Sequence, residues 1–166
     1  RRAWWLAINL VTAVIASLVI GQFENAIEKI VALAVLMPIV ASMGGNAGTQ
    51  TVTVAVRALA MGELTAANTL RFVAKEVAVG GLNGFVFALL MGGAVIAWYG
   101  DWKLGAVIGA AMICNLVAAA LAGTLIPLGL QKMRVDPAVS STVFLTTVTD
   151  VIGFLAFLGL ATIFLL

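Results

Sequence analysis

Five long apolar stretches constrain this chain more than any other feature of its sequence. Each has about 18 residues or more with almost no charge, which is the length that a helix needs to cross about 30 Å of hydrocarbon. Backbone polar groups find no water inside a bilayer, so segments that cross it must be helical when they are this apolar. The predicted spans cover residues 4–21, 29–56, 72–98, 104–129 and 138–165.

The composition supports a membrane protein and narrows its chemistry. Of 166 residues, 63% are hydrophobic, and only 9 basic and 7 acidic residues are present, too few for the surface of a soluble domain. The chain has no histidine and one cysteine, which excludes histidine-dependent nucleophile pairs, internal disulfides and Cys/His metal clusters. We therefore expect an all-α integral membrane protein that is not an enzyme, and the net charge of +2 gives no reason to expect a nucleic-acid partner.

The basic residues predict how the spans are oriented. Lys and Arg near the ends of spans favour the cytoplasm. A cytoplasmic N-terminus puts seven basic residues on that side and two on the other. We therefore expect a multi-pass protein of the cell (inner) membrane, with the N-terminus in the cytoplasm and the C-terminus on the outer side. The seven are Arg1, Arg2, Arg57, Arg71, Lys75, Lys132 and Arg134, and the two are Lys29 and Lys103.

The middle of the second predicted span is unusually small and polar for a membrane helix. The spacing of Gly44 and Gly48 fits simple helix packing. However, Gly45, Thr49 and Thr53 lie four residues apart, so they share one helix face on which carbonyls and hydroxyls would form a polar track. We favour a wet surface over packing alone as the interpretation of this segment.

Asp150 is the one acidic residue that is predicted to lie deep in the membrane. It follows Pro137 by 13 residues, or about 20 Å of helix. A charge at that depth costs on the order of 3 kcal/mol unless it is paired or wet, and no basic residue is predicted there. We expect a cation to be the missing partner, with protonation of the carboxyl as the alternative. Thr142 and Thr146 share the face of Asp150 by their spacing of four residues.

The two polar stripes are predicted to lie at one depth. Asn46 lies 11 residues, about 17 Å, from Arg57 at the end of its span, which is close to the depth of Asp150. Two such stripes, on the second and fifth spans, would line a pore. One chain has too few polar-lined helices to enclose a conduit, so we expect a homodimer. An oxygen-only ligand set suits a hard cation, and the sparse carboxylates favour hydrated Mg²⁺ over Ca²⁺.

A longer sequence pattern surrounds these residues. The run from Met37 to Gln50 reads MPIVASMGGNAGTQ, and it is followed by Arg57-Ala58-Leu59-Ala60 and Gly62-Glu63. With the Thr-rich last span and its lone Asp150, this pattern resembles the MgtE family of magnesium channels over essentially the whole chain. The resemblance implies a homodimeric channel with five helices per subunit, whose second and fifth helices line a pore that selects hydrated Mg²⁺.

The resemblance also implies roles for individual residues. Asp150 would be the central carboxylate of the ion site, and the backbone near Gly45 and Thr146 would accept hydrogen bonds from the waters of the ion. The family usually carries an N-terminal cytosolic regulatory part. We expect that part to be absent from a chain that begins with charge directly against its first span, leaving residues 1–166 as one transmembrane domain. The residues predicted in or beside the ion site are Gly45, Asn46, Thr49, Thr142, Thr146 and Asp150.

The lone Asp150 also fits other functions. A secondary transporter coupled to H⁺ or Na⁺ would use Asp150 as its titrating or ion-coupling group. A helical anchor or scaffold would use it only to pair within an assembly, and an intramembrane aspartyl protease would need a second carboxylate. Elsewhere, we expect Asn83 and Asn115 to form hydrogen bonds between helices and Cys114 to be a small buried hydrophobic residue.

Overall fold

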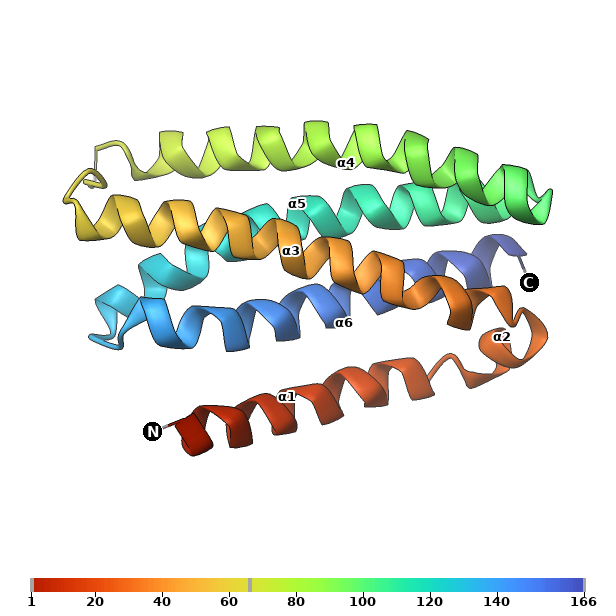
Figure 1. Cartoon of the computed structure of the whole chain (residues 1–166), viewed down its shortest axis with the longest axis horizontal. Helices are drawn as coiled ribbons and strands as arrows, with labels where there is room; N and C mark the ends of the chain where they lie inside the picture. The colour runs from red at the N-terminus through yellow and green to blue at the C-terminus, as the bar shows by residue number, and fades with distance from the viewer. Residues whose placement is uncertain (1, 66, 166) are drawn as a thin grey trace.

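The computed structural model describes residues 2–65 and 67–165, apart from the side chains of residues 138 and 139. Within these residues the chain is all-helical, and five of its six helices are long and apolar enough to cross a membrane (Figure 1). The helices are α1 (Arg2–Gly21), α2 (Glu24–Lys29), α3 (Ala32–Ala60), α4 (Thr69–Tyr99), α5 (Trp102–Lys132) and α6 (Pro137–Leu165).

The five predicted spans correspond to the five long helices, with small differences at their ends. The segment before the second span forms the short helix α2, and the next helix begins at Ala32 rather than at Lys29. The helices also extend past the predicted membrane boundary, since α3 continues beyond Arg57 and α5 reaches Lys132. Hydropathy locates the apolar part of a segment, whereas a helix continues through a charged turn that lies in water. Pro38 lies within α3, which is not interrupted there.

Helix α5 lies at the centre of the bundle. It packs against α3, α4 and α6, whereas α1 packs mainly against α6 (Figure 1). The main core joins buried side chains of the helices from α2 to α6, including Leu36 of α3, Ile108 of α5 and Phe157 of α6. Most side chains on the outer faces of α1 and α4 are apolar and exposed, as expected where a helix meets lipid. The core therefore positions α3 and α6 against α5 and each other.

Helices α4 and α5 form a tight antiparallel hairpin. Gly100 ends α4 with a φ of 68°, and the side chain of Asp101 caps α5 by accepting from the backbone N–H of Lys103 at 3.0 Å. The two helices approach closely through glycines, since a methyl group at Gly105 would lie 2.8 Å from the carbonyl oxygen of Gly92. Small residues allow this approach, which gains van der Waals contact where lipid offers no hydrophobic driving force.

A buried amide joins α5 to α3 and lies against α6. The Nδ2 group of Asn115, which is fully buried, donates to the carbonyl oxygen of Val40 at 2.9 Å. Its side chain fills the space over Gly44 and Gly153, where a Cβ would collide with it. The expectation that Asn115 forms a hydrogen bond between helices is confirmed.

The expectations for one residue of α4 and one of α5 are not met. Cys114 is exposed on the outer face of α5, so the prediction that it is buried was wrong. Asn83 is exposed and makes no hydrogen bond within the described part of the chain, so it does not link helices there. Asn83 instead lines a small crevice between α3, α4 and α5.

The basic residues gather at one end of the bundle. The start of α1, the α3–α4 connection and the α5–α6 connection lie together at the end where Figure 1 marks the N-terminus, and the described end of α6 lies at the opposite end. Six of the seven basic residues that were expected on one side fall in the described residues at this end, which we call the basic end. They are Arg2, Arg57, Arg71, Lys75, Lys132 and Arg134.

Candidate functional site

Helix α3 has a packing face and a polar face. Gly44 and Gly48 are buried, and a methyl group at Gly48 would lie 2.6 Å from Cδ1 of Leu145 on α6. The opposite face, which we call the polar face of α3, carries exposed side chains within the apolar span. Its residues are Ser42, Asn46, Thr49 and Thr53, with Gly45 partly exposed at its edge.

The threonine hydroxyls of this polar face donate their hydrogens along α3 itself. The hydroxyl of Thr49 donates to the carbonyl oxygen of Gly45 at 2.8 Å, and that of Thr53 donates to the carbonyl oxygen of Thr49 at 2.9 Å. Asn46 uses its Nδ2 group in a long hydrogen bond of 3.4 Å to Oγ of Ser42. A hydroxyl has one hydrogen, so once it is donated along the helix only lone pairs remain for a ligand. The polar face therefore offers hydrogen-bond acceptors.

Helix α6 carries the second stripe of predicted residues. Thr142 and Thr146 are exposed, and the hydroxyl of Thr146 donates to the carbonyl oxygen of Thr142 at 2.7 Å. Asp150 is partly buried, and its carboxyl makes no hydrogen bond or ion pair with the residues that the structure describes. A carboxylate inside a membrane-length helix thus has no partner in its own described chain, which is costly unless water or a cation reaches it.

Two packing contacts fix the relative level of the stripes. Gly48 of α3 lies against Leu145 of α6, and Val40 lies against Gly153, with Cγ1 of Val40 3.4 Å from a methyl group built there. The two helices are antiparallel, so the residues between these contacts lie at one level along the bundle. Gly45 and Asn46 fall between Val40 and Gly48, and Asp150 falls between Leu145 and Gly153. In agreement with the sequence, the structure brings the two predicted stripes to one depth.

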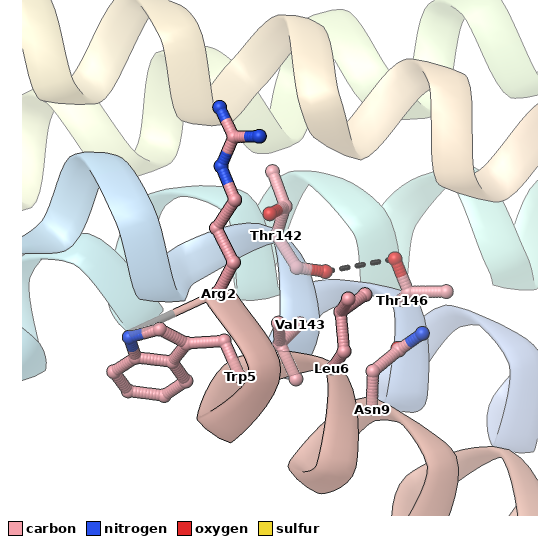
Figure 2. A pocket seen from close by; sticks show the side chains of 7 residues that line it. All are labelled: Arg2, Trp5, Leu6, Asn9, Thr142, Val143 and Thr146. Atoms are coloured by element: carbon pink, nitrogen blue, oxygen red, sulfur yellow. Dashed lines mark hydrogen bonds between the residues drawn. The ribbon is translucent and has the colours of Figure 1, made fainter.

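A groove beside the second stripe involves a helix that sequence reasoning did not include. Its volume is about 580 Å³, and it lies between α1 and α6 near the basic end. An edge-to-face contact of Trp5 with Phe144, whose ring centroids are 6.3 Å apart, joins the two helices beside it. Asn9 is a polar residue within an apolar span, and it is the sequence feature that could have indicated that α1 lies beside the second stripe. Figure 2 shows the groove and the residues that line it: Arg2, Trp5, Leu6, Asn9, Thr142, Val143 and Thr146.

The chemistry available at these stripes is that of oxygen acceptors around a single carboxylate. The described residues contain no group of three or more His, Cys, Asp or Glu side chains that could hold a metal ion directly. One carboxylate with hydroxyl, amide and carbonyl oxygens suits a cation that keeps most of its water, because those waters donate hydrogen bonds outward. A dehydrated ion would need more direct ligands than one chain supplies.

Fold and site together define a polytopic helical membrane protein with polar, acceptor-bearing faces on two of its spans. The family model of MgtE, which is described as a divalent cation transporter, matches residues 37–160 and so includes both stripes. The chain belongs to the MgtE family.

Curated relatives agree with this assignment. The chain is 35% identical over 165 residues to "Magnesium transporter MgtE" of Bacillus subtilis and 36% identical over 165 residues to the protein of the same name of Enterococcus faecalis. It is 35% identical over 164 residues to that of Thermus thermophilus. Each match covers 99% of this chain but only 36% or 37% of the relative, so the chain spans just over a third of their length.

Proposed function

We propose that this chain forms the membrane part of a magnesium channel, in which hydrated Mg²⁺ moves down its electrochemical gradient past Asp150. The observation that carries the proposal is a carboxyl that has no partner among the described residues and lies level with an acceptor-bearing polar face, inside membrane-length helices. Membership of the MgtE family and relatives named as magnesium transporters support the choice of ion. Six residues form the proposed ion site: Gly45, Asn46, Thr49, Thr142, Thr146 and Asp150.

The directions of the hydrogen bonds favour a hydrated ion as the cargo. Mg²⁺ releases its water reluctantly, and the bound waters point their hydrogens away from the metal. Thr49 and Thr146 donate their only hydrogens to their own helices, so their oxygens remain free to accept from such waters. Asp150 supplies the negative charge that the ion needs. The stripes would thus bind the hydration shell rather than replace it.

We further propose that the pore forms between two copies of the chain. The polar face of α3 is exposed in one subunit, and a second copy related by a two-fold axis would cover it and double the number of carboxylates. In this arrangement the basic end, with Arg57 and Lys132, faces the cytoplasm, because Lys and Arg favour that side. Residues 1–166 would act as a single transmembrane domain, with the N-terminus in the cytoplasm and the C-terminus on the outer side.

Cysteine cross-linking tests the two-fold arrangement. In a protein whose Cys114 is replaced by Ser, Asn46→Cys is expected to form a disulfide between subunits under mild oxidation. Leu82→Cys on the exposed face of α4 serves as the control and is expected to stay monomeric. Equal cross-linking at both positions would contradict a pore between the α3 polar faces.

The second candidate function is a secondary transporter coupled to H⁺ or Na⁺. The carboxyl of Asp150, which has no partner among the described residues, also supports this function, because a membrane carboxyl can carry a proton or a sodium ion through a transport cycle. The two functions differ in their energetics. A channel needs only the gradient of Mg²⁺, whereas a coupled transporter also responds to a gradient of pH or Na⁺.

Uptake of Mg²⁺ into liposomes tests the proposal. The purified protein is compared with Asp150→Asn, and with Glu76→Gln on α4 as a matched control that also removes a membrane carboxylate. Loss of a charged interaction worth about 1.5–3 kcal/mol is expected to lower uptake by Asp150→Asn about tenfold to a hundredfold. Glu76→Gln is expected to keep the uptake of the wild type.

Two outcomes would overturn this assignment. Equal uptake by the wild type and Asp150→Asn would remove Asp150 from the site. Uptake that stops when the pH and Na⁺ gradients are both collapsed, with the Mg²⁺ gradient kept, would replace the channel by the coupled transporter.

A further inference from the structure

The basic end also carries a positively charged groove that lies outside the proposed ion site. A groove of about 630 Å³ separates the end of α3 from the start of α4. These two helices scarcely touch each other, since each packs instead on α5. Three basic side chains line the groove, Arg57 from α3 and Arg71 and Lys75 from α4, together with the single acidic side chain of Glu63. The charged side chains of the groove therefore sum to +2 at neutral pH.

The three basic groups have no charged partner among the residues that the structure describes. Arg57, Arg71 and Lys75 are exposed, and none makes an ion pair with a described residue. Arg71 and Lys75 lie four residues apart on α4, so they share one face, and Arg57 lies in the last turn of α3. Like charges held around one groove repel each other, and an anion between them relieves that repulsion.

The surroundings of the groove indicate where such an anion comes from. Val54, Met61 and Phe72 also line the groove, and Met61 is a large hydrophobic side chain that is exposed. Basic groups thus stand next to apolar surface at the boundary of the membrane spans. This combination suits an amphiphile, whose phosphate meets the cations while its acyl chains lie on the apolar surface. A free phosphate ion would gain nothing from the apolar surface.

We propose that the groove binds the headgroup of an anionic phospholipid, whose phosphate bridges α3 and α4 through Arg57, Arg71 and Lys75. The headgroup stays at the mouth of the groove. Further into the membrane, α3 and α4 leave only a smaller crevice of about 250 Å³, which is lined by Glu76 and other polar residues and would repel a phosphate. The bound lipid connects two helices that the protein itself leaves apart.

Lipid binding by the purified protein tests this site. Native mass spectrometry compares retention of phosphatidylglycerol with retention of phosphatidylcholine, which has no net charge. One basic residue near a membrane surface contributes about a fivefold change in binding of an anionic lipid. The double variant R71Q/K75Q is therefore expected to lose about 30-fold in its preference for phosphatidylglycerol.

A matched control separates the groove from general attraction to the basic end. The double variant K132Q/R134Q removes the same charge at the same end of the bundle but outside the groove. It is expected to keep the preference of the wild type. Where R71Q/K75Q does not fold, R57Q on α3 replaces it, with an expected loss of about fivefold.

Three results would overturn the proposal. The first is equal retention of the two lipids by the wild type. The second is an equal loss in R71Q/K75Q and K132Q/R134Q, which would mean diffuse attraction to the basic end. The third is displacement of phosphatidylglycerol by inorganic phosphate at equal concentration, which would make a free anion the ligand. None of these readouts depends on Mg²⁺ flux, so the lipid site and the proposed channel function are tested independently.

Discussion

The two faces of α3 contain similar small and polar residues but meet different surroundings. On the packing face, Gly44 and Gly48 contact side chains of α5 and α6. On the polar face, Asn46 and Thr49 are exposed, and no neighbouring helix of the described chain covers them. Close packing is therefore confirmed for one side of this helix, and a wet surface stays a prediction for the opposite, exposed side.

The comparison shows that spacing within a helix matters more than residue type. Gly44 and Gly45 are adjacent, yet a methyl group would collide with Asn115 at the first and would meet nothing within 4 Å at the second. A step of one residue turns a side chain by about 100° around the helix, which is enough to move it from the core to the surface. Substitutions at neighbouring positions should therefore have opposite consequences.

The largest effect is expected from Gly44→Ala. Its methyl group would overlap the buried side chain of Asn115, and overpacking of this kind costs about 1–3 kcal/mol in the free energy of unfolding. Gly45→Ala is the control, and it is expected to leave stability unchanged or slightly higher because alanine favours helix. Denaturant unfolding in detergent measures both. Equal destabilisation by the two variants would break the distinction between the faces.

A smaller effect is expected from replacing the buried asparagine. Asn115→Leu loses the hydrogen bond to the carbonyl oxygen of Val40, and such bonds between membrane helices contribute about 0.6–1.7 kcal/mol. Asn83→Leu is the matched change at an exposed position without a hydrogen bond to described residues, and its free energy of unfolding should stay within about 0.5 kcal/mol of the wild type. A larger loss at Asn83 than at Asn115 would contradict the assignment of Asn115 to the packing side.

The smallest effect is expected from one hydroxyl on each face. Thr49→Val removes an exposed hydrogen-bond acceptor and should lower Mg²⁺ uptake by about twofold to tenfold, as expected for one hydrogen bond. Thr49→Ser keeps the oxygen and should restore uptake. Thr51 makes the same bond along the helix, to Ala47 at 3.2 Å, but lies beside Gly123 on the packing side. Uptake by Thr51→Val should therefore equal that of the wild type. Lower uptake by this variant would contradict the functional distinction between the two faces of α3.

The sequence predicted the number of spans because hydropathy over a membrane-length window is a strong signal. It missed helix α2, since a short segment with charges at Glu24, Glu28 and Lys29 also fits a turn. It placed Cys114 in the core wrongly, because an apolar helix gives no periodic pattern that separates a lipid-facing side from a buried one. Which side chains of α5 are buried depends on the helices that pack around it, and the sequence alone does not show that packing.

For the candidate site, the sequence predicted the depth of the stripes better than their surroundings. Counting residues from the membrane boundary was enough to place Asn46 and Asp150 at one level, and the contacts of Gly48 and Gly153 agree with it. Counting could not show that α1 lies beside Thr146, because neighbours across a bundle depend on which helices pack together. The assignment of these residues to an ion site stays a prediction.

The two-residue connection between Tyr99 and Trp102 bears on how the chain enters the membrane. During synthesis, α5 follows α4 almost at once, and a short loop makes their encounter entropically cheap. The glycine contacts of this hairpin can therefore form before α6 has been made. A flexible insertion between Gly100 and Asp101 would delay that encounter. Its first effect would therefore be on the assembly of the helices in the membrane during synthesis.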